Sequence, residues 1–409
     1  MRRLVLVFLV LIVYGSLYPF TGWSEPLAPL FSFLFASNTR VEKADLVQNV
    51  LAYMPFGLFM VAWLMRSTRF GVALVTAAVA GGMLSLLMES IQQFLPSRDA
   101  SRIDLILNIG GSVAGGVLAS LLHGHTLAGP RLVALRAHWL RTGTLPNLGL
   151  VALALWALSQ TSPLVPTFDL GQVRHGLALL YRSLREPDTM QVAQLLTYAC
   201  YLAGLGLLAR SVTRADKPAL LLFGSLVACV LVLKIIVEGR QLSLEALAGA
   251  FAAWMFLLVA SRLRQAAWMG IVLIGAGFVI SELAPGPDGI VYGFNWIPLV
   301  GQMRSLSGLQ NILEIFWPFF AIACFARSVT PFGHRQPVVV IGTVAIAAAV
   351  FWLEWSQQDL PGRFGDITQV LLACAGWIIP WTFAGPDFDA AATATVMGTK
   401  HRIRPTPDR

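Results

Sequence analysis

The chain has 409 residues, of which 56% are hydrophobic and only 12% are charged. A soluble globular domain carries about 25% charged residues, so this composition excludes a soluble fold and indicates a membrane protein. The net charge of +8 lies mostly between apolar segments, which is typical of topology signals and lipid contact and does not indicate nucleic-acid binding.

Apolar runs of about 17 to 25 residues predict helices that cross a membrane. Such runs lie near residues 4–20, 45–65, 70–94, 103–122, 147–163, 191–209, 218–237, 244–261, 266–283, 310–326, 337–357 and 367–383. We therefore predict an all-α polytopic membrane protein with about twelve transmembrane helices.

Basic residues indicate the orientation of these helices. Lys and Arg are more frequent at the termini and in alternate loops than in the opposite loops. Because basic loops tend to stay on the cytoplasmic side, we expect a multi-pass protein of a bacterial inner membrane with both termini in the cytoplasm.

The predicted helices divide into three groups of four. The second helix of each group ends in a similar basic sequence: Arg66-Ser67-Thr68, Arg210-Ser211-Val212-Thr213 and Arg327-Ser328-Val329-Thr330. Such recurrence indicates internal repeats, and an even number of spans in each group predicts parallel repeats. The predicted parts are a four-helix unit at 1–122, a basic amphipathic cytoplasmic linker at 123–146, a degenerate unit at 147–261, a further unit at 266–383 and a disordered cytoplasmic tail at 384–409. A second amphipathic connector is expected around 173–182.

Polar residues gather at the predicted outer ends of the second, third and fourth helices. They form three pairs four residues apart and one pair in the loop between helices: Asp45 with Asn49, Glu89 with Gln93, Asp104 with Asn108, and Arg98 with Arg102. A spacing of four puts both members on one helix face, so these faces are expected to meet in one site. The arginines could pair with the carboxylates or hold an anionic ligand.

The other two groups carry altered copies of this set. The third group keeps five of the residue types, namely Asn311, Glu354, Gln358, Arg363 and Asp366, but Gln369 and Ala373 replace Asp104 and Asn108. The middle group keeps only Lys234 with Glu238, then Arg240 and Glu245. The first group is therefore the best candidate for a functional site.

These residues resemble the VanZ-like membrane proteins, which are associated with teicoplanin resistance. The resemblance rests on Asn49, Pro55 and Gly57, followed by Glu89, Gln93, Pro96, Arg98, Asp104, Asn108 and Gly110. It covers about residues 1–122 and, less closely, 266–383. It implies an integral membrane protein of the cell envelope, without implying a particular reaction.

Four interpretations of the polar set remain open. It could hold a loop in place through Glu89–Arg98 and Asp104–Arg102 ion pairs, or bind a lipid-linked saccharide or peptidoglycan precursor. It could also be catalytic, with Glu89 and Asp104 as acid and base, or Lys234 could belong to a transporter. We favour a non-enzymatic envelope factor that binds a surface glycan or its lipid-linked precursor and affects teicoplanin susceptibility; the alternative is a membrane enzyme acting on such a substrate.

The sequence indicates no cofactor. The four cysteines fall inside predicted helices without CxxC spacing, which favours small buried side chains over metal ligands or disulfides. No Ser/His/Asp arrangement, zinc motif or phosphate loop is present. The expected partners are membrane lipids and the envelope precursor.

Overall fold

A computed structural model describes residues 2–17, 20, 22–26, 28–35, 43–96, 98–122, 129–163, 167, 169–260, 265–284, 293–299, 308–359, 363, 365–385 and 387–388. Over these residues the fold is all-helical, and β pairing is limited to two isolated bridges. The chain divides into two compact units, one over Met1–Arg136 and the other over Ala137–Gln302 with Ser307–Arg409.

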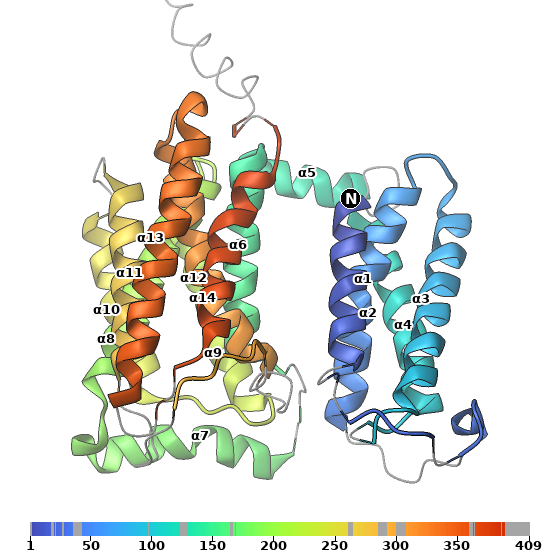
Figure 1. The fold of residues 1–409 in the computed structure, drawn as a ribbon. Coiled ribbons are helices and arrows are strands. Elements are labelled where there is room, and N and C mark those ends of the chain that lie inside the picture. The colour runs from blue at the N-terminus through green and yellow to red at the C-terminus, as the bar shows by residue number, and fades with distance from the viewer. Residues whose placement is uncertain are drawn as a thin grey trace, which may run out of the picture. The chain divides into compact units, whose positions relative to one another are not determined.

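The first unit contains four long helices, drawn in blue to cyan in Figure 1. They are α1 (Arg2–Leu17), α2 (Lys43–Leu64), α3 (Phe70–Gln92) and α4 (Arg102–Leu122), with a short 3-10 helix, η1, at Ser32–Leu34. Helices α2 and α4 pack closely because glycines line their contact. A Cβ at Gly57 would overlap the backbone of Ser112, and one at Gly115 would overlap the backbone of Met54. Small residues of this kind are what allow membrane helices to approach each other.

The second unit contains nine α-helices within the described residues. They are α6 (Thr144–Thr161), α7 (Leu170–Arg185), α8 (Val192–Val212), α9 (Ala219–Ile236), α10 (Leu244–Ala260), α11 (Ala266–Leu283), α12 (Gly308–Val329), α13 (Arg335–Ser356) and α14 (Ile367–Ile378). The short 3-10 helices are η2 (Pro187–Thr189), η3 (Phe332–His334), η4 (Gln357–Asp359) and η5 (Ile379–Thr382). The boundary between the units falls inside α5 (Gly129–Trp139).

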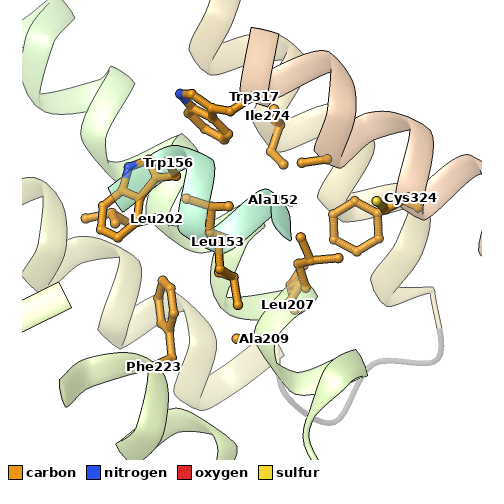
Figure 2. Packing of buried hydrophobic residues seen from close by; sticks show 14 of the residues in the cluster. Ala152, Leu153, Trp156, Leu202, Leu207, Ala209, Phe223, Ile274, Trp317 and Cys324 are labelled. Carbon is orange, nitrogen blue, oxygen red and sulfur yellow. The ribbon is translucent and has the colours of Figure 1, made fainter. Parts of the chain in front are cut away.

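One apolar core joins the predicted second and third groups of helices. Trp156 of α6, Leu205 of α8, Ile274 of α11 and Trp317 of α12 belong to the same buried cluster, and Figure 2 shows part of this packing. The predicted groups at 147–261 and 266–383 therefore share one core. The boundary between the two compact units lies instead near the predicted linker at 123–146.

Helix α7 differs from the long helices of its unit. It runs across their ends, at the bottom of Figure 1, and packs against α9 and α10. Gly176 lies against the backbone of Ile235 on α9, and Ser183 is buried. Leu170, Tyr181 and Leu184 are exposed. An amphipathic helix across the end of a bundle is typical of the membrane interface.

The spans that the sequence predicts all overlap helices, but fewer are long and apolar enough to cross a membrane. Within the described residues eight helices meet that test: Leu46–Leu64, Phe70–Gln92, Arg102–Leu121, Val192–Val212, Ala219–Ile236, Ala266–Leu283, Gln310–Val329 and Phe332–Ser356. Shorter apolar helices are Leu4–Leu17, Leu244–Ala260 and Ile367–Thr382. Over the described residues the protein is therefore all-helical, with helices long and apolar enough to cross a membrane, and the number twelve stays a prediction.

The start of the predicted tail is fixed to the second unit. Arg327 is only 1% exposed, and its guanidinium donates to the carbonyl of Pro380 at 2.6 Å and to the carboxylate of Asp387 at 2.9 Å. Arg335 also pairs with Asp387. A buried guanidinium needs a counter-charge, and Asp387 at the start of the predicted tail supplies it. Disorder of the segment 384–409 stays a prediction. Residues 389–409 lie outside the described residues.

Candidate ligand-binding site

Part of the first unit's polar set is brought together as expected. The side-chain amide of Asn49 on α2 donates to Asp104 on α4 at 2.8 Å. The amide of Asn108 on α4 donates to Ser85 on α3 at 2.9 Å. These bonds link three helices near the buried face of α4. The side chain of Asp45 lies outside the described residues.

Glu89 binds the start of the next helix. Its side chain is buried, and Oε2 accepts the backbone N–H of Ser101 at 2.8 Å. Ser101 in turn accepts the N–H of Ile103 through its hydroxyl at 3.2 Å, which is the usual role of a helix N-cap. The carboxylate of Glu89 therefore fixes the N-terminus of α4 against the end of α3.

The sequence left open whether the arginines pair with carboxylates or hold an anionic ligand, and the structure shows that both donate to backbone carbonyls. Arg98 donates to the carbonyl of Gly15 at 2.9 Å, and Arg102 donates to the carbonyl of Leu34 at 3.5 Å. Gln93 accepts the N–H of Phe31 at 3.1 Å. These contacts attach the α3–α4 loop to α1 and to the segment around η1.

The third predicted group contains the same kind of cap. Glu354 is buried, and its Oε2 accepts the backbone N–H of Asp366 at 2.9 Å. Asp366 caps α14 by accepting the N–H of Thr368 at 2.8 Å. Acceptor and donor are twelve residues apart here, as they are for Glu89 and Ser101.

Three arginines, each three residues before a helix N-cap, make the same type of contact. Each donates to a carbonyl two residues before the end of the first helix of its group. The pairs are Arg98 with Gly15 (2.9 Å), Arg240 with Ser159 (2.9 Å) and Arg363 with Ser281 (2.6 Å). Burial lowers the pKa of the Arg240 guanidinium, although an arginine stays protonated at neutral pH.

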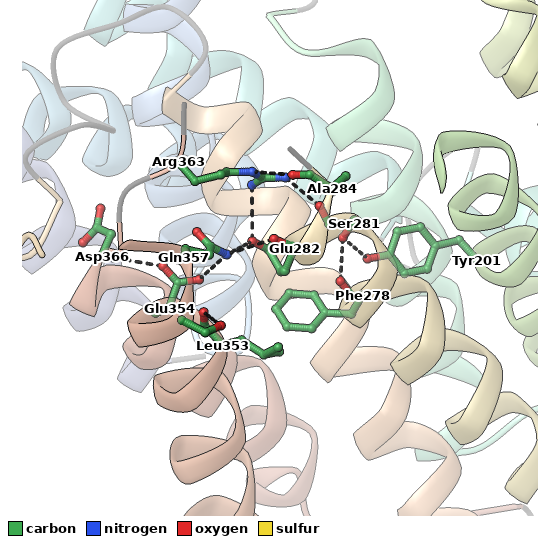
Figure 3. Close-up of polar contacts among 11 residues, drawn as sticks. Tyr201, Phe278, Ser281, Glu282, Ala284, Leu353, Glu354, Gln357, Arg363 and Asp366 are labelled. Carbon is green, nitrogen blue, oxygen red and sulfur yellow. Dashed lines mark hydrogen bonds and ion pairs between the residues drawn. The ribbon is translucent and has the colours of Figure 1, made fainter. Parts of the chain in front are cut away.

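Two members of the polar network around Arg363 were not predicted from the sequence, namely Gln357 and Glu282. Gln357 is 1% exposed and donates to the Glu282 carboxylate at 2.7 Å, as Figure 3 shows. The predicted residue, Gln358, donates to the carbonyl of Trp355, three residues earlier, at 3.1 Å. In the first unit Gln92, rather than Gln93, makes the matching contact, to the carbonyl of Ser16 at 2.8 Å. A Gln-Gln pair is present in both copies, and the prediction names the second member of each pair.

The second unit contains a cavity of about 860 Å³ with a largely polar lining. Helices from both of its predicted groups contribute: Tyr198 on α8, Lys234 on α9, Glu282 on α11, Glu314 on α12, Gln357 on η4 and Gln369 on α14. Arg240, Asn311, Arg363 and Asp366 also line it. The predicted third-group residues Asn311, Arg363 and Asp366 thus share one cavity with the middle-group residues Lys234 and Arg240.

The charged groups of the cavity have distinct partners. Lys234 is 5% exposed and donates to the hydroxyl of Tyr198 at 2.9 Å. Glu314 accepts the amide of Gln310 at 2.7 Å. Glu282 lies 3.5 Å from Arg363, which also donates to backbone carbonyls (Figure 3). Within the described ranges, no group of three His, Cys, Asp or Glu side chains is placed to hold a metal ion.

Residues 4–123 match the family model VanZ/LLP1. This part of the chain is VanZ-like. The match confirms the resemblance that the motifs of the first unit predicted, and its end at residue 123 coincides with the start of the predicted linker. The comparison with curated proteins gave no match, and neither did the comparison with solved structures.

Proposed function

We propose that the protein is a bacterial inner-membrane component that binds the polar head group of a surface glycan or its lipid-linked precursor without chemically changing it. The observation that carries this proposal is the polar cavity of the second unit. Its volume of about 860 Å³ lies in the range of about 300 to 1,000 Å³ that small-molecule sites occupy. Amides, hydroxyls and charged groups in one cavity suit the hydroxyl-rich and charged surface of such head groups.

Aromatic residues beside the cavity support a position at head-group depth. Trp296 and Trp355 are 59% and 51% exposed, and both rings pack against Phe294. Asn295 of the same segment accepts the N–H of Ile367 at 3.0 Å, directly after the cavity residue Asp366. Exposed tryptophans are enriched at membrane interfaces, so a lipid head group would reach the cavity without leaving the bilayer surface.

The predicted topology puts this end of the helices outside the cytoplasmic membrane. The cavity includes Gln191, Ala284 and Arg363, which lie in segments between helices and, under the positive-inside interpretation, on the extracytoplasmic side. Envelope precursors are displayed on that side. The VanZ-like match over residues 4–123 supports the link to the envelope, and an effect on teicoplanin susceptibility is part of the proposal.

The polar set of the first unit has a supporting role in this proposal. The hydrogen bonds of Asn49, Glu89 and Asn108 run between helices, so they stabilise the ends of α2, α3 and α4. Hydrogen bonds of this kind are expected where polar side chains hold a membrane loop in one conformation.

The test is binding of a labelled lipid-linked saccharide by the purified full-length protein. Thr197 lines the cavity and donates only to the carbonyl of its own helix, Ala193. Thr197→Trp should fill part of the cavity and weaken binding at least about tenfold, or roughly 1.4 kcal/mol. The matched control is Thr76→Trp, because Thr76 makes the same intrahelical bond on an exposed face of α3.

Retention of unchanged saccharide by the native protein and by the Thr76 variant, with loss in the Thr197 variant, supports the proposal. Equal binding by all three proteins would contradict the placement of the site. Release of a chemically altered saccharide would contradict the non-enzymatic function and favour a membrane enzyme.

A further inference from the structure

We propose that the cavity of the second unit recognises a zwitterionic group, in which a primary ammonium lies a few bonds from a phosphate or carboxylate. The inference rests on the proposed function, because it takes the cavity as the ligand site, and it adds the charge pattern of the ligand. Glu314 would receive the ammonium, and Lys234 together with Tyr198 would receive the anion.

The position and contacts of Lys234 suit the binding of an anion. It lies in the last turn of α9, is 5% exposed and faces the cavity. An ammonium has three donors, and the described structure uses one of them, in the bond to Tyr198 at 2.9 Å. The tyrosine ring lies 4.9 Å from the ammonium. No carboxylate of the described residues forms an ion pair with Lys234, so an anionic ligand would supply the counter-charge that a buried cation needs.

The position and contacts of Glu314 suit the binding of a cation. Its Oε1 accepts the amide of Gln310, one helical turn earlier on α12, at 2.7 Å. Over the described part of the chain, none of the ion pairs includes Glu314. Its carboxylate interacts electrostatically with Arg240 and Lys234. The direct hydrogen-bond partners of Glu314 and Lys234, however, are the neutral side chains of Gln310 and Tyr198. The two opposite charges are thus held in place separately.

The other charged groups of the cavity are engaged by the protein. Arg240 donates to the carbonyls of Ser159 and Ser162, and Arg363 makes equivalent carbonyl contacts as well as approaching Glu282. Asp366 caps α14. His175, at the edge of the cavity, contacts the amide of Gln241 at 3.0 Å. Among the described lining residues, one cation and one anion, Lys234 and Glu314, are therefore left to face the ligand.

This charge pattern selects among ligands. A simple anion would compensate Lys234 and add repulsion toward Glu314, and a simple cation would do the reverse. A neutral sugar would compensate neither. Because uncompensated charges are costly in a low-dielectric site, a group carrying both charges should bind best. An ethanolamine phosphate group has this chemistry, either as a lipid head group or free in solution.

The experiment uses full-length protein in detergent. It measures the binding of short-chain phosphatidylethanolamine, phosphatidylglycerol and free phosphoethanolamine. Phosphatidylglycerol has the phosphate but not the ammonium. The native protein should prefer phosphatidylethanolamine over phosphatidylglycerol at least about tenfold. Glu314→Gln should remove this preference by weakening only the ethanolamine lipid. Lys234→Met should weaken both lipids.

The matched controls are Glu186→Gln and Arg182→Met. These residues form an exposed ion pair on α7, with side chains 63% and 69% exposed, and they carry the same charge changes outside the cavity. Both controls should keep the native preference. The comparison of the two lipids on the native protein needs no variant, so it tests the inference even where a cavity variant does not fold.

Binding of ethanolamine and glycerol lipids with equal affinity, while the labelled saccharide still binds in a Thr197-dependent manner, would overturn the zwitterion inference and leave the proposed function intact. Loss of all Thr197-dependent binding would overturn both. Where the preference holds, competition by free phosphoethanolamine identifies a soluble ligand, and its failure to compete identifies the lipid.

Discussion

Glu89 and Glu354 show how a buried carboxylate can serve the fold of a membrane protein. Each accepts one backbone N–H at the N-terminus of the following helix, at 2.8 Å and 2.9 Å. The first turn of a helix carries N–H groups without partners inside the helix, and in an apolar surrounding an unpaired N–H is costly. The glutamate therefore replaces the water that a soluble protein would use.

This role predicts different effects for two substitutions of Glu89. Glu89→Ala leaves the Ser101 N–H without its acceptor and should lower stability by about 1–3 kcal/mol. Glu89→Gln keeps an acceptor oxygen and should cost less than half as much. Thermal unfolding in detergent measures both, with Glu186→Ala as an exposed control. Equal destabilisation by Gln and Ala would show that the charge, rather than the acceptor, is what α4 needs.

Part of the network around Arg363 was predictable, but Gln357 and Glu282 were not. The sequence identified Glu354 and Arg363 as partners of one polar region, and both lie there. It favoured Gln358 because four residues make one helical turn. The α-helix, however, ends at Ser356 and continues as the 3-10 turn Gln357–Asp359. The tighter turn directs Gln357 inward, and a helix end of this kind is not visible in the residue spacing.

At the level of elements, the contact between α2 and α4 depends on the absence of side chains. Gly115 has no space for a Cβ, whereas Gly110 on the same helix has no heavy atom within 4 Å of that position. Several glycines lie on this helix. The sequence could not tell which of them face α2, because adjacent glycines point to different sides.

The two glycines provide a matched pair of substitutions. Gly115→Ala should push α2 and α4 apart and cost about 1–3 kcal/mol, as overpacking does. Gly110→Ala should be neutral or stabilising by up to about 1 kcal/mol, because alanine favours the helix. Resistance of the purified protein to unfolding by a denaturing detergent measures the difference. Equal resistance of the two variants would refute the close contact.

For the whole molecule, the sequence predicted the helices but not the shared core, and the linker at 123–146 stays a prediction. The boundary between units at Arg136 lies within the predicted segment 123–146. Trp156 and Trp317 come from different predicted groups yet belong to one buried cluster. Contacts between repeats depend on side-chain complementarity across distant segments, which periodicity does not report. The three parallel repeats stay a prediction, supported by the equivalent contacts of Arg98, Arg240 and Arg363.

Parallel repeats predict which loops lie on the same side of the membrane. In a variant without its native cysteines, single cysteines at Asp99 and Glu238 should react with a membrane-impermeant thiol reagent on intact spheroplasts. Cysteines at Thr68 and Asp216 should react only after permeabilisation. All four positions are exposed, so a difference reports sidedness. If the cysteines that replace Asp99 and Glu238 reacted from opposite sides of the membrane, parallel repeats would be refuted.

The attachment of Asp387 sets a practical limit on shortening the polypeptide. Apolar sequence ends near Phe383, and trimming at that point would look harmless. It would remove the carboxylate that faces Arg327, a guanidinium only 1% exposed. Any truncated version meant to keep its native architecture should therefore extend at least through Phe388, with affinity tags appended beyond it.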